Sequence, residues 1–162
     1  MQKKIKNKKI SDGFMMVEVI IAISIIIVSV LVAMSVTQKS VSVARQALHT
    51  SEATFLLEEG AEAVRIIRDN SWSDISNLSP GTTYYPIFSG TWALSASPTT
   101  VGIFTRTMSI TSVNRDNSTQ DIAISGTNDA GTKLITITVS WNEGGEVLSK
   151  TLSFYIMDIF SA

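Results

Sequence analysis

Cysteine is absent from this 162-residue chain, and histidine occurs once, as His49. Without cysteine there is no disulfide and no thiolate nucleophile, so an exported domain would depend on its own core or on neighbouring molecules. A catalytic triad or a His-based metal site would have to use His49. The simpler interpretation of His49 is an ordinary surface histidine. The chain also lacks a P-loop and a dinucleotide-binding fingerprint. We therefore expect no enzymatic activity, no catalytic residue, no metal site and no cofactor.

Charge is almost absent from residues 14–36, where Glu18 is the only charged side chain among apolar residues and a few serines. About 20 apolar residues are enough for a helix to span a bilayer. Such a helix must be continuous, because lipid offers no partner to an unpaired backbone group. The sequence therefore predicts that residues 14–36 are the transmembrane part of a helix.

Glu18 is out of place in this segment, because an ionisable group inside a membrane helix costs roughly 2.5–3.5 kcal/mol on insertion scales. Two interpretations are open. Glu18 could lie at interface depth and reach water, or it could have a cationic partner within the membrane.

Basic residues are concentrated before the apolar segment, at Lys3, Lys4, Lys6, Lys8 and Lys9. With one Asp, they give residues 1–13 a net charge of +4, which leaves −5 for the other residues out of a total of −1. By the positive-inside rule, this asymmetry places the N-terminus in the cytoplasm and the remainder outside. The basic cluster could instead indicate nucleic acid, but no interleaved aromatics and no second basic patch support a direct nucleic-acid site.

Asp12-Gly13, a large apolar residue at Phe14 and an acid four residues later at Glu18 follow the lysines. This pattern resembles the class III leader peptide of type IV prepilins. The resemblance implies that a prepilin peptidase removes the leader, residues 1–13, by cutting between Gly13 and Phe14, and N-methylates Phe14. It also implies a role in subunit assembly, in which Glu18 neutralises the new α-amine of Phe14 in a neighbouring subunit. Pairing a buried carboxylate with a cation lowers the cost of both charges.

An ordinary secretory signal has its small-residue cleavage site after the apolar region. Here Gly13 precedes the apolar region, so the span would stay with the mature protein.

The helical pattern continues beyond the span, and no proline occurs before Pro80. Apolar residues recur at three- and four-residue steps or their sums, while charges fall elsewhere. The apolar positions are Val41, Ala44, Leu48, Phe55 and Leu56, and the charged ones are Lys39, Arg45, Glu52 and Glu58. We predict one helix over residues 14–69, about 80 Å long. Its amphipathic part, residues 37–70, would cover a globular domain.

The end of this helix shows two stripes. Leu56, Gly60, Ala63 and Ile67 form the apolar one, and Glu58, Glu62, Arg65 and Asp69 the charged one. The spacing predicts Glu62–Arg65 and Arg65–Asp69 pairs. Glycine costs about 1 kcal/mol in a helix relative to alanine, and the position of Gly60 on the apolar stripe favours close packing against a sheet.

Residues 57–69 resemble a block of minor pilins of the pilus-modification kind, in which Leu-Glu-Glu-Gly leads into Glu-Ala-Val-Arg and Arg-Asp. The chain departs from major pilins at Ser35, where they commonly carry a helix-breaking proline.

Residues 71–162 are expected to form a globular, β-rich head. All three prolines lie in residues 71–100, an irregular region with one short strand near residues 84–88. Phe104, Met108 and Ile110 share one face of a strand over about residues 102–113, together with Arg106. Ile135, Ile137, Val139 and Trp141 alternate with polar residues, and a turn at residues 142–145 leads to a returning strand that carries Leu148, Lys150, Leu152, Phe154 and Ile156. With residues 121–124, this predicts a small antiparallel sheet of about four strands in a pilin-like α+β fold, packed on the amphipathic part of the helix.

The head offers two weaker candidates. Asn114, Asp116, Ser118 and Asp121 alternate oxygen ligands like a calcium loop, but they lack the glycine and the bidentate glutamate of an EF-hand, and a solvated hairpin loop is the simpler interpretation. Tyr84, Tyr85 and Trp92 are expected at the surface, where isolated aromatics are usual.

We therefore expect a structural subunit of a type IV pilus-like filament, a minor pilin, held in the cytoplasmic membrane as a single-pass protein and then assembled into an extracellular or periplasmic filament. Its expected partners are other pilin subunits, the prepilin peptidase, the pilus or secretion assembly machinery and the membrane. One alternative is a type II secretion or DNA-uptake pseudopilin. An alternative of another class is a single-pass, membrane-anchored binding domain that is never processed and leaves Glu18 unexplained.

Overall fold

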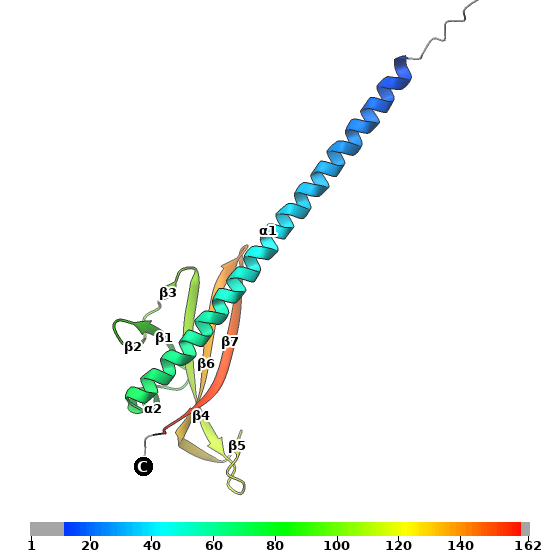
Figure 1. The fold of residues 1–162 in the computed structure, drawn as a ribbon. Coiled ribbons are helices and arrows are strands. Elements are labelled where there is room, and N and C mark those ends of the chain that lie inside the picture. Colours follow the sequence, from blue (N-terminus) through cyan, green and yellow to red (C-terminus); the bar gives the residue numbers. More distant parts are fainter. Residues whose placement is uncertain (1–11, 160–162) are drawn as a thin grey trace, which may run out of the picture. The chain divides into compact units, whose positions relative to one another are not determined.

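A computed structural model describes residues 12–159 of the chain, with side chains from residue 15 onward, and Figure 1 shows its fold. Residues 1–11, which include the five leader lysines, and residues 160–162 lie outside the described part. The chain divides into two compact units that meet between Gln46 and Ala47. The second unit contains the end of the long helix together with the sheet.

The long helix α1 (Asp12–Asn70) contains 59 residues. Its bounds confirm the predicted helix over residues 14–69, and it runs through Ser35 without a break. Backbone continuity follows from the absence of proline, which would remove a hydrogen-bond donor and clash with the preceding turn. The Ser71 amide donates to the Ile67 carbonyl at 3.0 Å, and a short helix, α2 (Ser73–Ser76), follows.

Seven strands form one antiparallel sheet, and their bounds are β1 (Thr83–Phe88), β2 (Trp92–Ser95), β3 (Thr100–Val101), β4 (Phe104–Arg115), β5 (Ile122–Ala123), β6 (Thr127–Glu143) and β7 (Glu146–Met157). The order is β2-β1-β4-β6-β7, and β3 and β5 pair with β4. The α+β fold is confirmed, but about four strands was an underestimate. The strands not expected, β2 and β3, have four and two residues, too few for a period-two pattern to be visible.

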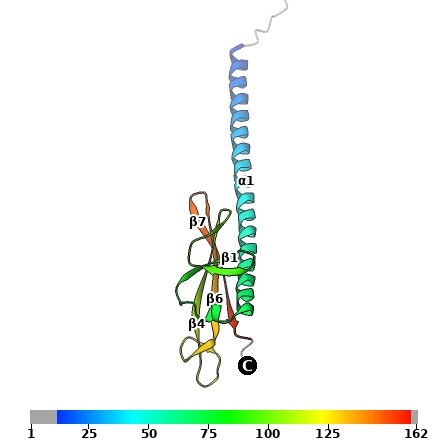
Figure 2. The same cartoon turned by 90° about the vertical axis from the view of Figure 1, so that its left-hand side faces the viewer.

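The alternation predicted for the long strands is confirmed. In β4 and β6, the side chains on one face are buried and form the core with helix α1. The buried residues are Phe104, Met108 and Ile110 of β4, Ile135, Ile137, Val139 and Trp141 of β6, and Ala53, Leu57, Val64 and Ile67 of α1. Figure 2 shows the end of α1 lying along the sheet. The face of β7 is less buried, because β7 is an edge strand of the sheet.

Gly60 lies at a close approach between the helix and the sheet. A Cβ at this position would lie 3.0 Å from Cδ of Arg106 and 3.1 Å from Cγ2 of Ile137. The predicted close packing is confirmed. Arg106 does lie on the buried face of β4, and its Nη1 donates to Oε2 of Glu59 at 2.6 Å. This ion pair explains how a charged residue is accommodated there, since a buried guanidinium needs a partner.

Two expectations for the helix surface were wrong. Leu48 and Phe55 belong to no buried stripe, because the sheet contacts the neighbouring face of α1 that carries Ala53 and Leu57. The Glu62–Arg65 pair is present at 3.1 Å, but Asp69 is bound by Arg68 at 2.7 Å. The Arg65 guanidinium lies 5.4 Å from the centre of the Phe154 ring instead.

The isolated surface positions expected for His49 and three aromatic residues were also wrong. His49 is half-buried, pairs with Glu143 through Nδ1 and meets the ring of Phe104 edge-on. Its partner is 94 residues away in sequence, which no local pattern could show. Tyr84, Tyr85 and Trp92 are half-buried, and the guanidinium of Arg106 lies 5.3 Å from the centre of the Trp92 ring.

Candidate functional site

The apolar segment of α1, residues 15–36, is the first candidate site, because no other part of the described chain covers it. Every residue in it is exposed, and the large apolar side chains expose half or more of their surface. This stretch makes α1 long and apolar enough to cross a membrane, and no other helix in the described part is. An apolar surface of this extent needs lipid or the apolar surface of other molecules.

The serine hydroxyls in this segment are satisfied within the helix. Ser24, Ser29 and Ser35 each donate to the carbonyl four residues earlier, at 2.7 Å. A hydroxyl bonded in this way needs no partner outside the helix. Polar groups therefore do not prevent the segment from lying in lipid, with one exception.

The exception is Glu18, whose carboxylate has no partner among the described residues. It borders a shallow hollow of about 400 Å³ that is otherwise lined by Val17, Ile21, Ala22 and Ile25. Ala22, one turn further along the helix, leaves room beside the carboxylate for a group from another molecule. The arrangement can accept a cation, because it combines an unpaired acid with an apolar, open surrounding.

The predicted cleavage residues lie at the start of the same helix. Gly13 and Phe14 fall within α1, but the described side chains begin at residue 15, so the structure does not test their role. Four residues separate Phe14 from Glu18, which is about one helical turn or 6 Å of rise. The role of this pair in processing and assembly stays a prediction.

Comparison of the chain with protein-family models, with curated proteins and with solved structures found no match. The resemblance to type IV prepilins therefore depends on the residues of the leader and the span. The long N-terminal helix followed by an antiparallel sheet is consistent with it.

The oxygen-rich loop of the head is held together by its own hydrogen bonds. Asp116 Oδ1 accepts the backbone N–H groups of Ser118 at 2.7 Å and Thr119 at 2.9 Å. These bonds, that of Thr119 first, hold the pKa of the Asp116 carboxyl below its ordinary value. The Asn114 amide donates to the Ile124 carbonyl at 3.2 Å. In the described residues, no three His, Cys, Asp or Glu side chains lie close enough together to hold a metal ion.

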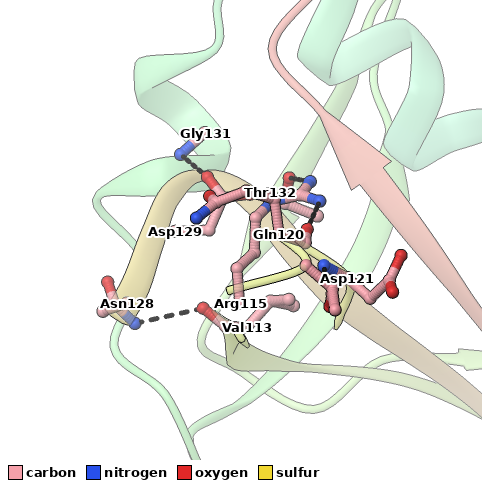
Figure 3. A network of polar contacts seen from close by, with 9 residues as sticks. Val113, Arg115, Gln120, Asp121, Asn128, Asp129, Gly131 and Thr132 are labelled. Carbon is pink, nitrogen blue, oxygen red and sulfur yellow. Dashed lines mark hydrogen bonds and ion pairs between the residues drawn. The ribbon is translucent and has the colours of Figure 1, made fainter. Parts of the chain in front are cut away.

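Beside this loop lies a polar network that the sequence did not reveal, centred on Arg115 and Asp129 (Figure 3). Arg115 donates from Nε to Asp129 Oδ2 at 2.6 Å, from Nη1 to the Gln120 carbonyl at 2.9 Å, and from Nη2 to Thr132 Oγ1 at 3.3 Å. The other carboxylate oxygen of Asp129 accepts the Gly131 amide at 2.9 Å. Both charged groups have their partners within the network. We therefore interpret the network as structural, because it links β4 to β6 at the end of the sheet.

Replacing Asp129 by asparagine should lower the free energy of unfolding by about 2 kcal/mol at neutral pH, the order expected for hydrogen bonds to a charged group. The Thr132 hydroxyl and then Arg115 lower the pKa of the Asp129 carboxyl from 3.8. A lowered folded-state pKa stabilises the fold above the unfolded value, and this contribution is lost as the pH falls through the folded value. The difference between the two proteins should therefore shrink below about pH 4.

Thermal unfolding at several pH values measures this difference. Asp121→Asn, at an exposed position in the neighbouring loop between β4 and β5, is the matched control and should change stability by less than about 0.5 kcal/mol. An equal loss in both variants, or a loss independent of pH, would contradict the prediction.

Proposed function

We propose that this chain is a minor pilin, a structural subunit of a type IV pilus-like filament. In this proposal a prepilin peptidase cuts between Gly13 and Phe14, and the subunit assembles through its N-terminal helix. The observation that carries the proposal is the unpaired carboxylate of Glu18 on an exposed, otherwise charge-free helix segment. The long helix followed by an antiparallel sheet supports it.

Cleavage and assembly are linked in this proposal by one charge pair. Hydrolysis of the Gly13–Phe14 peptide bond creates a cationic α-amine on Phe14. In the filament, Glu18 of one subunit pairs with that amine on another subunit. The pairing lowers the cost of burying each of the two charges. Because an unpaired Glu18 would cost roughly 2.5–3.5 kcal/mol in a membrane, the pair also favours one register between neighbouring helices.

Before assembly, the subunit would be held in the cytoplasmic membrane by residues 14–36. The lysines of residues 1–13 would keep the N-terminus in the cytoplasm, in accordance with the positive-inside rule. The head, residues 71–162, would then be exported. A pseudopilin of a secretion or DNA-uptake system would use the same helix and the same charge pair, and differs in the length of the assembly.

Mass spectrometry of the N-terminus of the protein from its native membrane tests this proposal. We expect a chain that begins at N-methylated Phe14, lighter than the unprocessed chain by the 13 leader residues. Gly13→Val should abolish this processing, because the resemblance to prepilins makes Gly13 the residue before the cut. A native chain that retains its lysine-rich leader would instead support a membrane-anchored binding domain and reject the filament subunit.

A further inference from the structure

The outer face of the sheet, which points away from α1, carries rows of hydroxyl side chains. Successive side chains of a strand point to opposite faces of its sheet. On the outer face every second residue is Ser or Thr in three neighbouring strands, from Thr105 to Ser109 on β4, from Thr136 to Ser140 on β6 and from Ser149 to Ser153 on β7. None of these Ser and Thr residues is buried, whereas the residues between them on β4 and β6 are buried in the face that packs with α1.

The pairing of the strands places these hydroxyls opposite one another. The middle row joins Thr107, Thr138 and Thr151, and the rows on either side of it are built in the same way. Neighbouring strands lie about 4.8 Å apart, and alternate residues along one strand lie about 7 Å apart. The three rows therefore form a regular grid of hydroxyl groups without any charged side chain.

The hydroxyls of the grid keep hydrogen-bonding capacity for a ligand. The Thr138 and Thr151 hydroxyls lie 3.4 Å apart, and those of Thr136 and Ser153 lie 3.0 Å apart. A hydroxyl offers one donor and two acceptor positions, so each of these pairs can bond a further group. The hydroxyls that make no hydrogen bond within the described part of the chain are those of Thr105, Ser109, Ser140 and Ser149.

At one end of the grid the same face is hollowed. The next row after the grid joins Thr111, Leu134 and Tyr155, and these three residues line a hollow of about 300 Å³ together with residues of the segment around β5. Tyr155 exposes 50% of its surface. None of the described residues that line the hollow is charged. Its volume is at the lower end of the range of small-molecule sites, about 300–1,000 Å³.

We propose that the outer face of the sheet binds a neutral polysaccharide, with one sugar ring against Tyr155 in the hollow and the following sugars along the grid. The absence of charge selects a neutral ligand, because a charged one would lose hydration without gaining an ionic partner. A sugar chain carries hydroxyl groups at regular intervals, and these can donate to and accept from Ser and Thr hydroxyls. The C–H groups on the face of a sugar ring can pack on the exposed ring of Tyr155.

This binding site goes beyond the proposed filament function and does not depend on it. Every residue that it uses lies in the sheet or in the segment around β5, and none belongs to α1. The Glu18 charge pair and the processing of the N-terminus can therefore be right or wrong without any effect on the binding of sugar by the head.

Sedimentation of the purified full-length chain in detergent with insoluble cellulose, chitin or starch tests the proposal. Calcium alginate serves as an anionic polysaccharide. We expect saturable binding to at least one of the three neutral polymers and none to alginate. Tyr155→Ala should weaken this binding at least about tenfold, because it removes the aromatic ring of the hollow. Phe55→Ala is the matched control, since it removes an exposed aromatic ring from α1 and should leave binding unchanged.

A second variant tests the grid. Thr138→Val combined with Thr151→Val removes two hydroxyls of the middle row and keeps the shape of the side chains. It should weaken binding about tenfold, as expected for the loss of two neutral hydrogen bonds. Thr82→Val combined with Thr91→Val is the matched control, since it removes two exposed hydroxyls outside the grid. Thermal unfolding of each variant checks the fold, and Tyr155→Ala carries the test alone if the double valine variant does not fold.

Three results would overturn the proposal. The first is binding to none of the three neutral polymers, and the second is equal or stronger binding to alginate. The third is binding that is unchanged in either folded test variant or that falls equally in its control, because the hollow and the grid would then not form the site.

Discussion

The variant Glu18→Ala is expected to be processed normally and to be absent from filaments. Removal of the carboxylate takes away the partner proposed for the Phe14 amine, so that amine would be left uncompensated in an apolar surrounding. Membrane insertion should not suffer, because an ionisable residue in the span costs roughly 2.5–3.5 kcal/mol that alanine does not. We therefore expect a complete loss of incorporation with unchanged or higher amounts of protein in the membrane.

Immunoblots of sheared filaments measure incorporation, and immunoblots of membranes measure the amount of inserted protein. Mass spectrometry of the N-terminus measures processing. Glu18→Gln is the first control, because it keeps the size of the side chain and removes the charge, and it should behave like alanine. Ser24→Ala is the second, because the Ser24 hydroxyl is already bonded to the Ile20 carbonyl within the helix, and it should assemble normally. Normal incorporation of Glu18→Ala would remove the charge pair from the mechanism.

The substitution Ile137→Ala should lower the free energy of unfolding of the head by about 3–4 kcal/mol, within the range for truncation of a buried isoleucine. Ile137 is fully buried on β6, and its Cγ2 would lie 3.1 Å from a Cβ placed on Gly60 of the helix. The truncation therefore leaves a cavity between the two layers. Since small domains are stable by only about 5–15 kcal/mol, we expect a large fall in the melting temperature.

The same substitution at Ile124 is the matched control for Ile137. Ile124 is fully exposed, so Ile124→Ala should change stability by less than about 0.5 kcal/mol. Thermal unfolding of the full chain in detergent compares the two variants directly. Equal effects at the two positions would show that the sheet does not pack on the helix through β6.

Much of the fold could be predicted from two periodicities. The stretch without proline before Pro80 predicts the long helix to within two residues at each end. The alternation from Ile135 to Trp141 predicts which face of β6 is buried. Both predictions succeed because helices of this length and long strands bury one face, and burial of one face leaves a repeat in the sequence.

The contacts of the head could not be predicted in this way. His49 of α1 pairs with Glu143 of β6, and Arg115 of β4 pairs with Asp129 of the neighbouring strand β6. The sheet register shifts between Ser112 and Val113, just before Arg115, so counting residues along β4 does not show which residue lies opposite. The candidate site shows the same division, since the pattern around Glu18 is visible in sequence, while the partner proposed for its carboxylate would belong to another molecule.

The sequence by itself determined that a continuous apolar helix carries one acid, Glu18, and that a β-rich segment follows. These features depend on local properties, namely residue type and spacing, which a chain possesses before it folds. Only the tertiary structure decided which side of the helix the sheet covers, because that depends on how distant residues fit together. By placing Ala53 and Leu57 under the sheet, it left Leu48 and Phe55 exposed.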